Sequence, residues 1–348
     1  MRRLLLLLAA ACSSAPPDAR PATAPAPVAT YQNPIWDTDF PDPAVLRASD
    51  GWTYAYATQT VVAGKMQNLQ VGRSRDLVRW ERLADGMPVR PSWASGTQKF
   101  WAPHVVERDG SFILYFSAEH DRRDGHCVGA ARAAAPGGPF VDVGEPVVCG
   151  KGFVHIDPMA FDDPRTGKRL LYWGSGFEPL RAQELAADRV RLAPGSSPVM
   201  LVGVDPGERY GRLVEGAWVV YREPWYVLFY SGDNCCGDEA HYAVLVARSR
   251  AATGPFTRLA AAEGRPTSAV VEANDRWNAP GHNAVITDAA GTDWLLYHAI
   301  DRRRPALEGR IEGDRDVRRV LLMDPITWRE GWPSAPGAPS SRPRPLAP

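Results

Sequence analysis

The sequence has no excess of charge of either sign. Among its 348 residues, 40 Lys and Arg balance 40 Asp and Glu, so the formal net charge is zero. A nucleic-acid-binding surface normally needs a basic excess, so nucleic acid is excluded as a partner. Disorder along the whole chain is also excluded, because it requires low hydrophobicity and 45% of the residues are hydrophobic.

The N-terminus lacks an apolar run long enough to span a bilayer. A positively charged start (residues 1–3) is followed by five leucines (residues 4–8), three alanines (residues 9–11) and Cys12. This pattern is typical of a signal peptide, so we predict that residues 1–11 are one and that the chain is exported. A Cys at this place resembles a bacterial lipoprotein signal, which predicts a lipid on Cys12 as the only membrane contact and a place in the cell envelope. Ordinary secretion is the alternative.

Two segments lack any hydrophobic period. Residues 12–30 are rich in Pro and Ala and are predicted to form a tether. Residues 333–348 have a similar composition and are predicted to be a disordered tail. The folded domain is therefore expected to span residues 31–332.

Cysteine is scarce, with five residues at positions 12, 127, 149, 235 and 236. Four remain after Cys12 is set aside, an even number in an exported chain, and Cys127–Cys149 is a plausible disulfide. The neighbours Cys235 and Cys236 either form a disulfide or stay reduced. No Cys-x-x-Cys or His-Glu-x-x-His spacing occurs, so no metal site is predicted.

Turn-forming and aromatic residues, in contrast, are abundant. The chain has 31 Gly and 32 Pro, which favours a turn-rich, all-β structure over a helical bundle. It also has 12 Trp and 11 Tyr. In a neutral protein these indicate core packing together with flat surfaces for an uncharged ligand such as a sugar.

Five short apolar runs recur along the chain. Their central aromatic residues are separated by 59, 57, 57 and 68 residues and are Tyr56, Tyr115, Tyr172, Phe229 and Tyr297. Each run has about five residues bounded by Gly, Asp or Pro, as in a buried strand. The repeat predicts an all-β, five-bladed β-propeller with one four-stranded sheet per blade. Two β-sandwiches with accidental spacing are the alternative.

A polar or aromatic residue lies 14 or 15 residues before each central aromatic, ahead of a short apolar stretch. These residues are Asp42, Trp101, Asp157, Glu215 and His282. The innermost strands of a propeller surround a central channel, so equivalent positions are expected to converge on one axis.

The convergent set contains the groups that glycoside hydrolysis requires. One carboxylate must be ionised to activate water, and another must be protonated to release the leaving oxygen. A third carboxylate keeps the acid protonated near neutral pH, because like charges raise a pKa. The predicted catalytic residues are Asp42, Asp157 and Glu215. The predicted substrate-binding residues are Trp101, His104 and His282.

Each of these residues alone also has an ordinary structural explanation. An Asp before Pro, as at Asp42 and Asp157, is often a turn residue. Glu215 is harder to explain in this way, because a lone Glu entering an apolar strand is costly unless it is paired or functional. Independent turn residues have no reason to share one offset, so we prefer the functional interpretation.

These segments resemble glycoside hydrolase family 43, a family of five-bladed propellers that contains arabinanases, α-L-arabinofuranosidases and β-xylosidases. The matching segments, which run from about residue 31 to 332, are Asn33-Pro34, Asp39-Phe40-Pro41-Asp42-Pro43, Ser74-Arg75-Asp76-Leu77 with Trp80, Trp101-Ala102-Pro103-His104-Val105, Ile156-Asp157-Pro158, Val214-Glu215-Gly216 and Gly281-His282-Asn283.

The resemblance implies an inverting mechanism, in which Asp42 is the general base, Glu215 the general acid, and Asp157 orients the acid and raises its pKa. It implies a plant polysaccharide or oligosaccharide containing arabinose or xylose as substrate, and no required cofactor. The Gly281-His282-Asn283 element looks more like the arabinan-cleaving branch, an endo-1,5-α-L-arabinosidase or an α-L-arabinofuranosidase. A calcium ion near His282 is also considered, although hard cations prefer oxygen ligands.

Three other functions are compatible with the same sequence. A non-catalytic carbohydrate-binding propeller would favour similar pockets repeated between blades, whereas here one unsymmetrical set is expected on the axis. A β-xylosidase of the same family is the second alternative. The third is the related fructan-cleaving group, a retaining one, whose carboxyl groups should be about 5–5.5 Å apart rather than about 6.5–9.5 Å.

Overall fold

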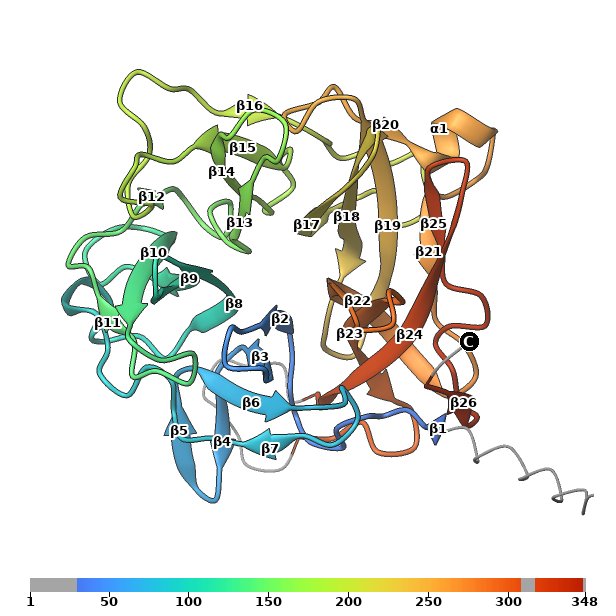
Figure 1. Ribbon diagram of the computed structural model, residues 1–348, viewed down its shortest axis with the longest axis horizontal. Helices are drawn as coiled ribbons and strands as arrows, with labels where there is room; N and C mark the ends of the chain where they lie inside the picture. Colours follow the sequence, from blue (N-terminus) through green and yellow to red (C-terminus); the bar gives the residue numbers. More distant parts are fainter. Residues whose placement is uncertain (1–29, 308–316, 347–348) are drawn as a thin grey trace, which may run out of the picture.

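The structure, a computed structural model, describes residues 30–307 and 317–346. Five antiparallel sheets are arranged around a central axis, and a short helix, α1 (Leu259–Glu263), lies at the periphery (Figure 1). The predicted five-bladed β-propeller is confirmed. The predicted signal peptide, Cys12 and almost all of the predicted tether lie outside the described residues.

Each blade has four strands that follow one another from the axis outward. They are, in blade I, β2 (Ala44–Arg47), β3 (Thr53–Ala57), β6 (Gln70–Ser74) and β7 (Glu81–Arg82); in blade II, β8 (Phe100–Arg108), β9 (Ser111–Glu119), β10 (His126–Ala133) and β11 (Val141–Asp142); in blade III, β13 (Met159–Asp162), β14 (Arg169–Trp173), β15 (Arg181–Glu184) and β16 (Val199–Met200); in blade IV, β17 (Val214–Arg222), β18 (Trp225–Asn234), β19 (His241–Ser249) and β20 (Thr257–Arg258); and in blade V, β22 (Trp277–Thr287), β23 (Asp293–Asp301), β24 (Arg319–Arg329) and β25 (Trp332–Ser334).

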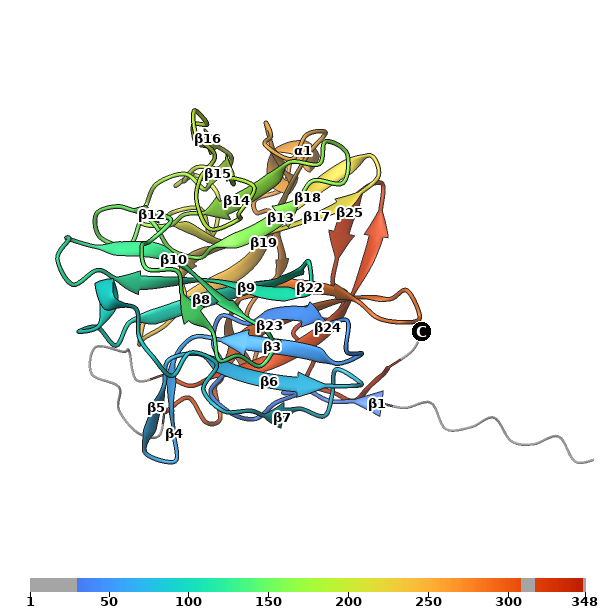
Figure 2. The same cartoon turned by 60° about the vertical axis from the view of Figure 1, so that its left-hand side comes forward.

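Short additional strands complete the sheets. β12 (Val148–Cys149) and β21 (Ala269–Val271) pair with β10 and β19, and β4 (Thr60–Val62) and β5 (Lys65–Gln67) form a hairpin beside blade I. A 3-10 turn, η1 (Ser92–Ala94), precedes blade II. In Figure 1 the inner strands β2, β8, β13, β17 and β22 lie closest to the axis, and Figure 2 shows the same cartoon turned by 60°.

The second strand of every blade carries the repeated aromatic run. Tyr56, Tyr115, Tyr172, Phe229 and Tyr297 lie on β3, β9, β14, β18 and β23, and all five side chains are fully buried. A strand in the middle of a blade has other blades against both of its faces. Apolar residues therefore run continuously along it rather than alternating.

The first described residues close the ring onto the last blade. The amide of Ile35 donates to the carbonyl of Leu321 (3.0 Å), and the amide of Phe40 donates to that of Arg319 (2.7 Å). The segment before blade I therefore lies along the first half of β24, while β25 pairs with its second half. This closure fixes Asp42, two residues beyond Phe40, relative to blade V.

The prediction of a disordered tail after Trp332 is corrected. The chain is ordered through residue 346, and β26 (Arg344–Pro345) pairs with β1 (Thr30–Tyr31) at the edge of the molecule (Figure 1; β1 is also labelled in Figure 2). The physical reason is Asp324, a carboxylate with no exposed surface. It accepts hydrogen bonds from the Ser340 amide (3.2 Å) and the Arg344 guanidinium (3.0 Å). A buried carboxylate needs such donors, so polar contacts order a segment that has no hydrophobic pattern.

Both possible disulfides are formed, Cys127–Cys149 between β10 and β12 and Cys235–Cys236 in the turn between β18 and β19.

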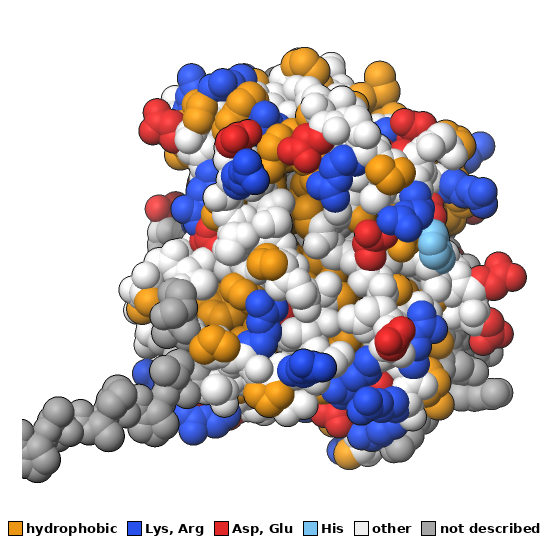
Figure 3. Space-filling model, turned by 90° about the vertical axis from the view of Figure 1, so that its right-hand side faces the viewer, with side chains coloured by type: hydrophobic (Ala, Val, Ile, Leu, Met, Phe, Trp, Pro, Cys, Tyr) orange, Lys and Arg blue, Asp and Glu red, His pale blue; other side chains and the backbone are white. Residues whose placement is uncertain are grey.

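The outer surface near α1 and β25 carries Lys, Arg, Asp and Glu interspersed with apolar side chains (Figure 3), in keeping with the zero net charge. Within residues 30–307 and 317–346, no helix is both long and apolar enough to cross a membrane.

Candidate active site

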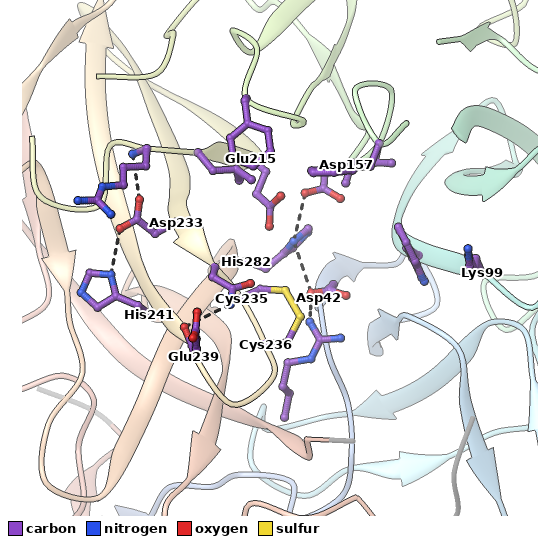
Figure 4. Close-up of a pocket in the computed structure, with 18 residues that line it drawn as sticks. Asp42, Lys99, Asp157, Glu215, Asp233, Cys235, Cys236, Glu239, His241 and His282 are labelled. Carbon is purple, nitrogen blue, oxygen red and sulfur yellow. Dashed lines mark hydrogen bonds and ion pairs between the residues drawn. A yellow bond between two sulfur atoms is a disulfide. The ribbon is translucent and has the colours of Figure 1, made fainter. Parts of the chain in front are cut away.

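The five predicted axial residues line one cavity of about 730 Å³. Asp42 precedes β2, Asp157 precedes β13, Trp101 and Glu215 are the second residues of β8 and β17, and His282 lies in the middle of β22. Figure 4 shows Asp42, Asp157 and Glu215 around His282. The cavity thus brings together one side chain from each blade, as the shared offset predicted.

A residue with a left-handed backbone, before or within the inner strand of each blade, directs these side chains. The residues with positive φ are Asp42 (55°), Ala102 (44°), Asp157 (59°), Gly216 (63°) and His282 (46°). Register shifts follow at Trp101/His104, Glu215/Trp218 and Gly281/Ala284. The structural equivalents in blades II and IV are therefore Ala102 and Gly216, and the functional side chains, Trp101 and Glu215, come one residue earlier. Such backbone conformations cost energy and persist only where their surroundings hold them.

Side chains at the ends of the second strands hold four of these backbones. The amides of Ala102, Asp157 and His282 donate to hydroxyl groups of the preceding blade, at 2.8, 3.0 and 2.8 Å; the acceptors are Thr58, Ser117 and Ser231. In blade I the Asp42 amide donates to Nδ1 of His298 (3.1 Å) on β23 of blade V. Each blade therefore positions the next blade's contribution to the cavity.

Asp42 is surrounded by positive charge and hydrogen-bond donors. Its Oδ1 accepts from the Arg319 guanidinium (2.8 Å), and its Oδ2 accepts from the Thr58 hydroxyl (2.6 Å). Burial would raise the pKa of Asp42, but Arg319 and His298 outweigh it, so the pKa lies below its usual value. The side chain is 12% exposed. Asp42 is therefore ionised and open to the cavity, as a general base must be.

Glu215 is held from two sides by hydroxyl groups. Ser175 donates to its Oε2 (2.6 Å) and Tyr242 donates to its Oε1 (2.8 Å). Burial raises the pKa of Glu215 and the negative charge of Asp42 adds to the rise, while the two hydroxyl groups oppose it. The net direction is upward, which is the requirement for a general acid.

Asp157 is linked to the backbone next to Glu215. Its Oδ2 accepts the amide of Gly216 (2.9 Å), the residue that follows Glu215, and its amide is held by Ser117. Burial raises the pKa of Asp157 well above its usual value, and the charges of Glu215 and Asp42 raise it further. Asp157 and Glu215 therefore both bind a proton more tightly than an isolated carboxyl group does.

His282 lies between two of the carboxylates. Its Nδ1 is 3.6 Å from Oδ1 of Asp42 and 3.6 Å from Oδ2 of Asp157. Burial lowers the pKa of His282, and the Asp42 charge only partly restores it. A neutral imidazole in this place can hydrogen-bond to a hydroxyl group of a bound sugar without adding charge.

Aromatic side chains form further parts of the cavity wall. Trp101 stacks on His126 with ring centroids 4.3 Å apart. Phe153 and Phe177 contact each other edge to face and are 36% and 63% exposed, which is unusual for large apolar groups. Flat apolar groups beside polar ones suit a sugar ring, which has an apolar face and polar edges.

His104 does not belong to the cavity, and we correct the expectation that it contacts the substrate. It is 5% exposed, its Nδ1 accepts the Ala160 amide (3.3 Å), and its ring packs edge-on against Trp218. Burial lowers its pKa to about 3. The register shift after Trp101 turns His104 away from the cavity, so it joins blades II and III instead.

The residues around His282 do not fit a calcium ion. The nearest oxygen of Asp42 is paired with the Arg319 guanidinium, and that of Asp157 accepts an amide. A hard cation needs six to eight oxygen ligands, and a neighbouring guanidinium repels it. No group of three or more His, Cys, Asp or Glu in the described part of the chain is arranged to hold a metal ion.

Several residues that hold the carboxylates were not predicted from the sequence, among them Ser175, Tyr242, His298 and Arg319. A partial signal existed, because three of the repeated apolar runs end in a hydroxyl residue, Thr58, Ser117 or Ser231. Nothing marked Arg319, which the ring closure brings to Asp42 from 277 residues away in sequence.

The family model described as "Glycosyl hydrolases family 43" matches residues 31–333. The chain belongs to glycoside hydrolase family 43. It is 28% identical to a xylan 1,3-beta-xylosidase of Vibrio sp over 87% of this chain and 57% of that protein. It is 25% identical to an extracellular endo-alpha-(1->5)-L-arabinanase 1 of Bacillus subtilis over 84% of this chain and 86% of that protein.

The fold has a solved counterpart in the same family. The alpha-L-arabinanase of Cellvibrio cellulosa, solved in complex with arabinohexaose, superimposes with a TM-score of 0.69 and 22% identity, over 85% of this chain and 95% of that one. The family 43 chain described here is thus a glycoside hydrolase, and nothing in its family relationship points to a required cofactor.

Removing the charge next to Asp42 is expected to shift the pH profile of this family 43 enzyme. Arg319→Met removes the cation that holds the pKa of Asp42 down. The pKa of Asp42 should rise, so a higher pH is needed to ionise it and the acidic limb of kcat/KM should move to higher pH. A kcat/KM–pH profile checks this. Arg304→Met, at an exposed Arg paired with Asp37, is the control. An unmoved limb in Arg319→Met would show that Arg319 does not set the charge of Asp42.

Proposed function

We propose that the enzyme is an inverting hydrolase of arabinan and arabino-oligosaccharides, with Asp42 as general base, Glu215 as general acid and Asp157 as the residue that orients the acid. One observation carries the proposal. Two carboxyl groups in one cavity have their pKa values moved in opposite directions, Asp42 by Arg319 and His298, and Glu215 by burial. Such a separation assigns base and acid roles to two carboxyl groups.

In the proposed reaction, water bound next to Asp42 attacks the anomeric carbon from the face opposite the leaving group. Asp42 takes a proton from the water as the new C–O bond forms. Glu215 donates its proton to the glycosidic oxygen as the old C–O bond breaks, so both products leave neutral. The Gly216 amide bonded to Asp157 holds the backbone of the acid in place during the step. The configuration at the anomeric carbon is inverted.

Support for arabinan as the substrate comes from relatives and from sequence. The Bacillus subtilis relative is named as an endo-arabinanase, and Gly281-His282-Asn283 resembles the arabinan-cleaving branch. A β-xylosidase is the second candidate, because the Vibrio relative with 28% identity carries that name, although the chain spans only 57% of its length. Incubation with arabinan, arabinoxylan and aryl pentosides, followed by sizing of the products, separates the two and distinguishes endo from exo cleavage.

The stereochemistry of the product gives an independent test. Proton NMR during the first turnovers of an α-linked arabino-oligosaccharide should show the β-anomer of the new reducing end first, with the α-anomer appearing only through mutarotation. A retained anomer would instead require a covalent intermediate, and would favour the retaining, fructan-cleaving type of site.

We also infer that the enzyme is exported and that Cys12 carries a lipid. The signal-like start, the pair of disulfides and the extracellular arabinanase relative support export. Mass spectrometry of the N-terminal peptide from membrane and culture fractions tests both parts. A diacylglyceryl-modified Cys12 supports the anchor, and an unmodified N-terminus in the medium supports ordinary secretion.

A further inference from the structure

The disulfide Cys235–Cys236 lies in the wall of the catalytic cavity. Both cysteines line the same cavity as Asp42 and Glu215, and both side chains are half-buried rather than covered. Figure 4 shows the disulfide and Lys99 on opposite sides of Asp42. The cysteines therefore face the space that a saccharide must occupy to reach the carboxylates.

The disulfide supplies apolar surface on a side of the cavity that is otherwise polar. Blade IV lines the cavity around the cysteines with Asp233, Asn234, Glu239 and His241. A disulfide carries no charge and has no proton to donate, and its sulfur and methylene groups are apolar and polarisable. It can pack against the C–H face of a sugar ring, while the charged neighbours remain available to hydroxyl groups.

The turn that carries the disulfide is held in place on both sides. The Asp233 carboxylate accepts the Arg212 amide (2.9 Å) and pairs with His241 (2.9 Å), and the Asn234 side chain donates to the Glu239 carbonyl (3.2 Å). Behind the turn, Cys235 packs against the cluster that contains Tyr242. A wall fixed in this way before binding loses little conformational freedom when a ligand arrives.

We propose that the Cys235–Cys236 disulfide is a substrate-contacting wall, packed against the apolar face of a pentose unit bound beside the catalytic carboxylates. This rests on the proposed function for the identity of the sugar. Opening the ring lets the two side chains separate and adds two polar thiol or hydroxyl groups, so affinity for the saccharide should fall. The chemical step should be spared, because the hydrogen bonds described above for Asp42, Asp157 and Glu215 come from other residues.

The test compares Cys235→Ser/Cys236→Ser with the parent enzyme on arabinohexaose. KM is expected to rise roughly tenfold, the factor that corresponds to about 1.4 kcal/mol, with kcat within about twofold. In a Glu215→Gln background, the Kd measured by calorimetry should weaken by the same factor. Asp238→Asn, an exposed residue of the same turn that is not among the side chains lining the cavity, is the matched control and should change neither constant.

Reduction of the unmodified enzyme provides a second route if the double variant does not fold. A phosphine reductant and one water open the half-buried disulfide: the phosphorus gives two electrons to the S–S bond, and the water supplies the oxygen of the phosphine oxide and the two protons of the thiols. Cys127 is fully buried and Cys149 is partly buried against the core cluster around it, so Cys127–Cys149 should be reduced more slowly, and mass spectrometry identifies the form in which only Cys235–Cys236 is open. The KM of this form should rise as in the variant. Equal KM and Kd in the open and closed forms, or a fall in kcat alone, would overturn the proposal. Failure of the parent enzyme to cleave arabinohexaose would instead overturn the proposed substrate.

Discussion

Glu215→Gln is expected to lower kcat on arabino-oligosaccharides by about 10³-fold, while α-L-arabinofuranosyl fluoride should still be hydrolysed at close to the parent rate. General acid catalysis contributes about 10²–10⁴-fold where a leaving oxygen must be protonated. Fluoride leaves without a proton, so the loss of the acid should matter little for it. Steady-state rates on the two substrates, measured side by side, give the comparison.

Glutamine can replace Glu215 with little change to the surrounding hydrogen bonds. A glutamine can still accept the Ser175 hydroxyl at its oxygen, so the cavity should keep its shape. An unchanged melting temperature serves as the control for folding. Equal losses on both substrates would show that the defect lies in binding or folding rather than in proton donation, and the acid would then have to be sought elsewhere.

Much of the fold could be predicted from the sequence because propeller blades repeat. The central aromatics, from Tyr56 to Tyr297, lie in strands that are buried on both faces, and such strands show the same short apolar run wherever they occur. The closure of the ring and the ordered tail could not be predicted. They depend on backbone pairing with β24 and on donors around the buried Asp324, which leave no hydrophobic pattern in the sequence.

The candidate site was predictable only where its residues follow the repeat. A common offset before each central aromatic marked Asp42 and Glu215 among the residues that line the cavity. It did not reveal the register shift that turns His104 away. It also could not reveal Arg319, because that residue reaches Asp42 through ring closure and belongs to no repeated pattern. Charges that shift the pKa of a carboxyl group act through space, so their positions are known only from the folded chain.

The ring closure links the stability of the propeller to the ionisation of the base. Phe40 and Arg319 are joined through their backbones, and the Arg319 side chain then reaches Asp42. His298 on β23 holds the Asp42 amide from the same blade. Asp42 belongs to blade I. Blade V therefore supplies both the positive charge next to its carboxylate and the group that holds its backbone. A loosened closure would be expected to disturb catalysis before the fold is lost.

Asp42→Asn is expected to abolish activity on both substrates. An amide cannot take the proton of the attacking water, and a better leaving group does not supply a base, so kcat should fall by about 10³–10⁴-fold on arabino-oligosaccharides and on the glycosyl fluoride alike. This pattern differs from that of Glu215→Gln. The same pair of rate measurements therefore assigns the two roles separately.

Asp37→Asn is the control for this substitution, because Asp37 lies on the same segment but is 53% exposed and pairs with Arg304 and Arg318 outside the cavity. It should retain the parent rates. Binding of arabinohexaose to Asp42→Asn, measured by calorimetry, should be preserved within a few fold, since asparagine keeps the shape of aspartate: its Oδ1 can still accept from the Arg319 guanidinium, and its amide nitrogen can donate to the Thr58 hydroxyl. If Asp42→Asn lost activity on the oligosaccharide but kept it on the fluoride, Asp42 would be the proton donor, and the roles of Asp42 and Glu215 would have to be exchanged.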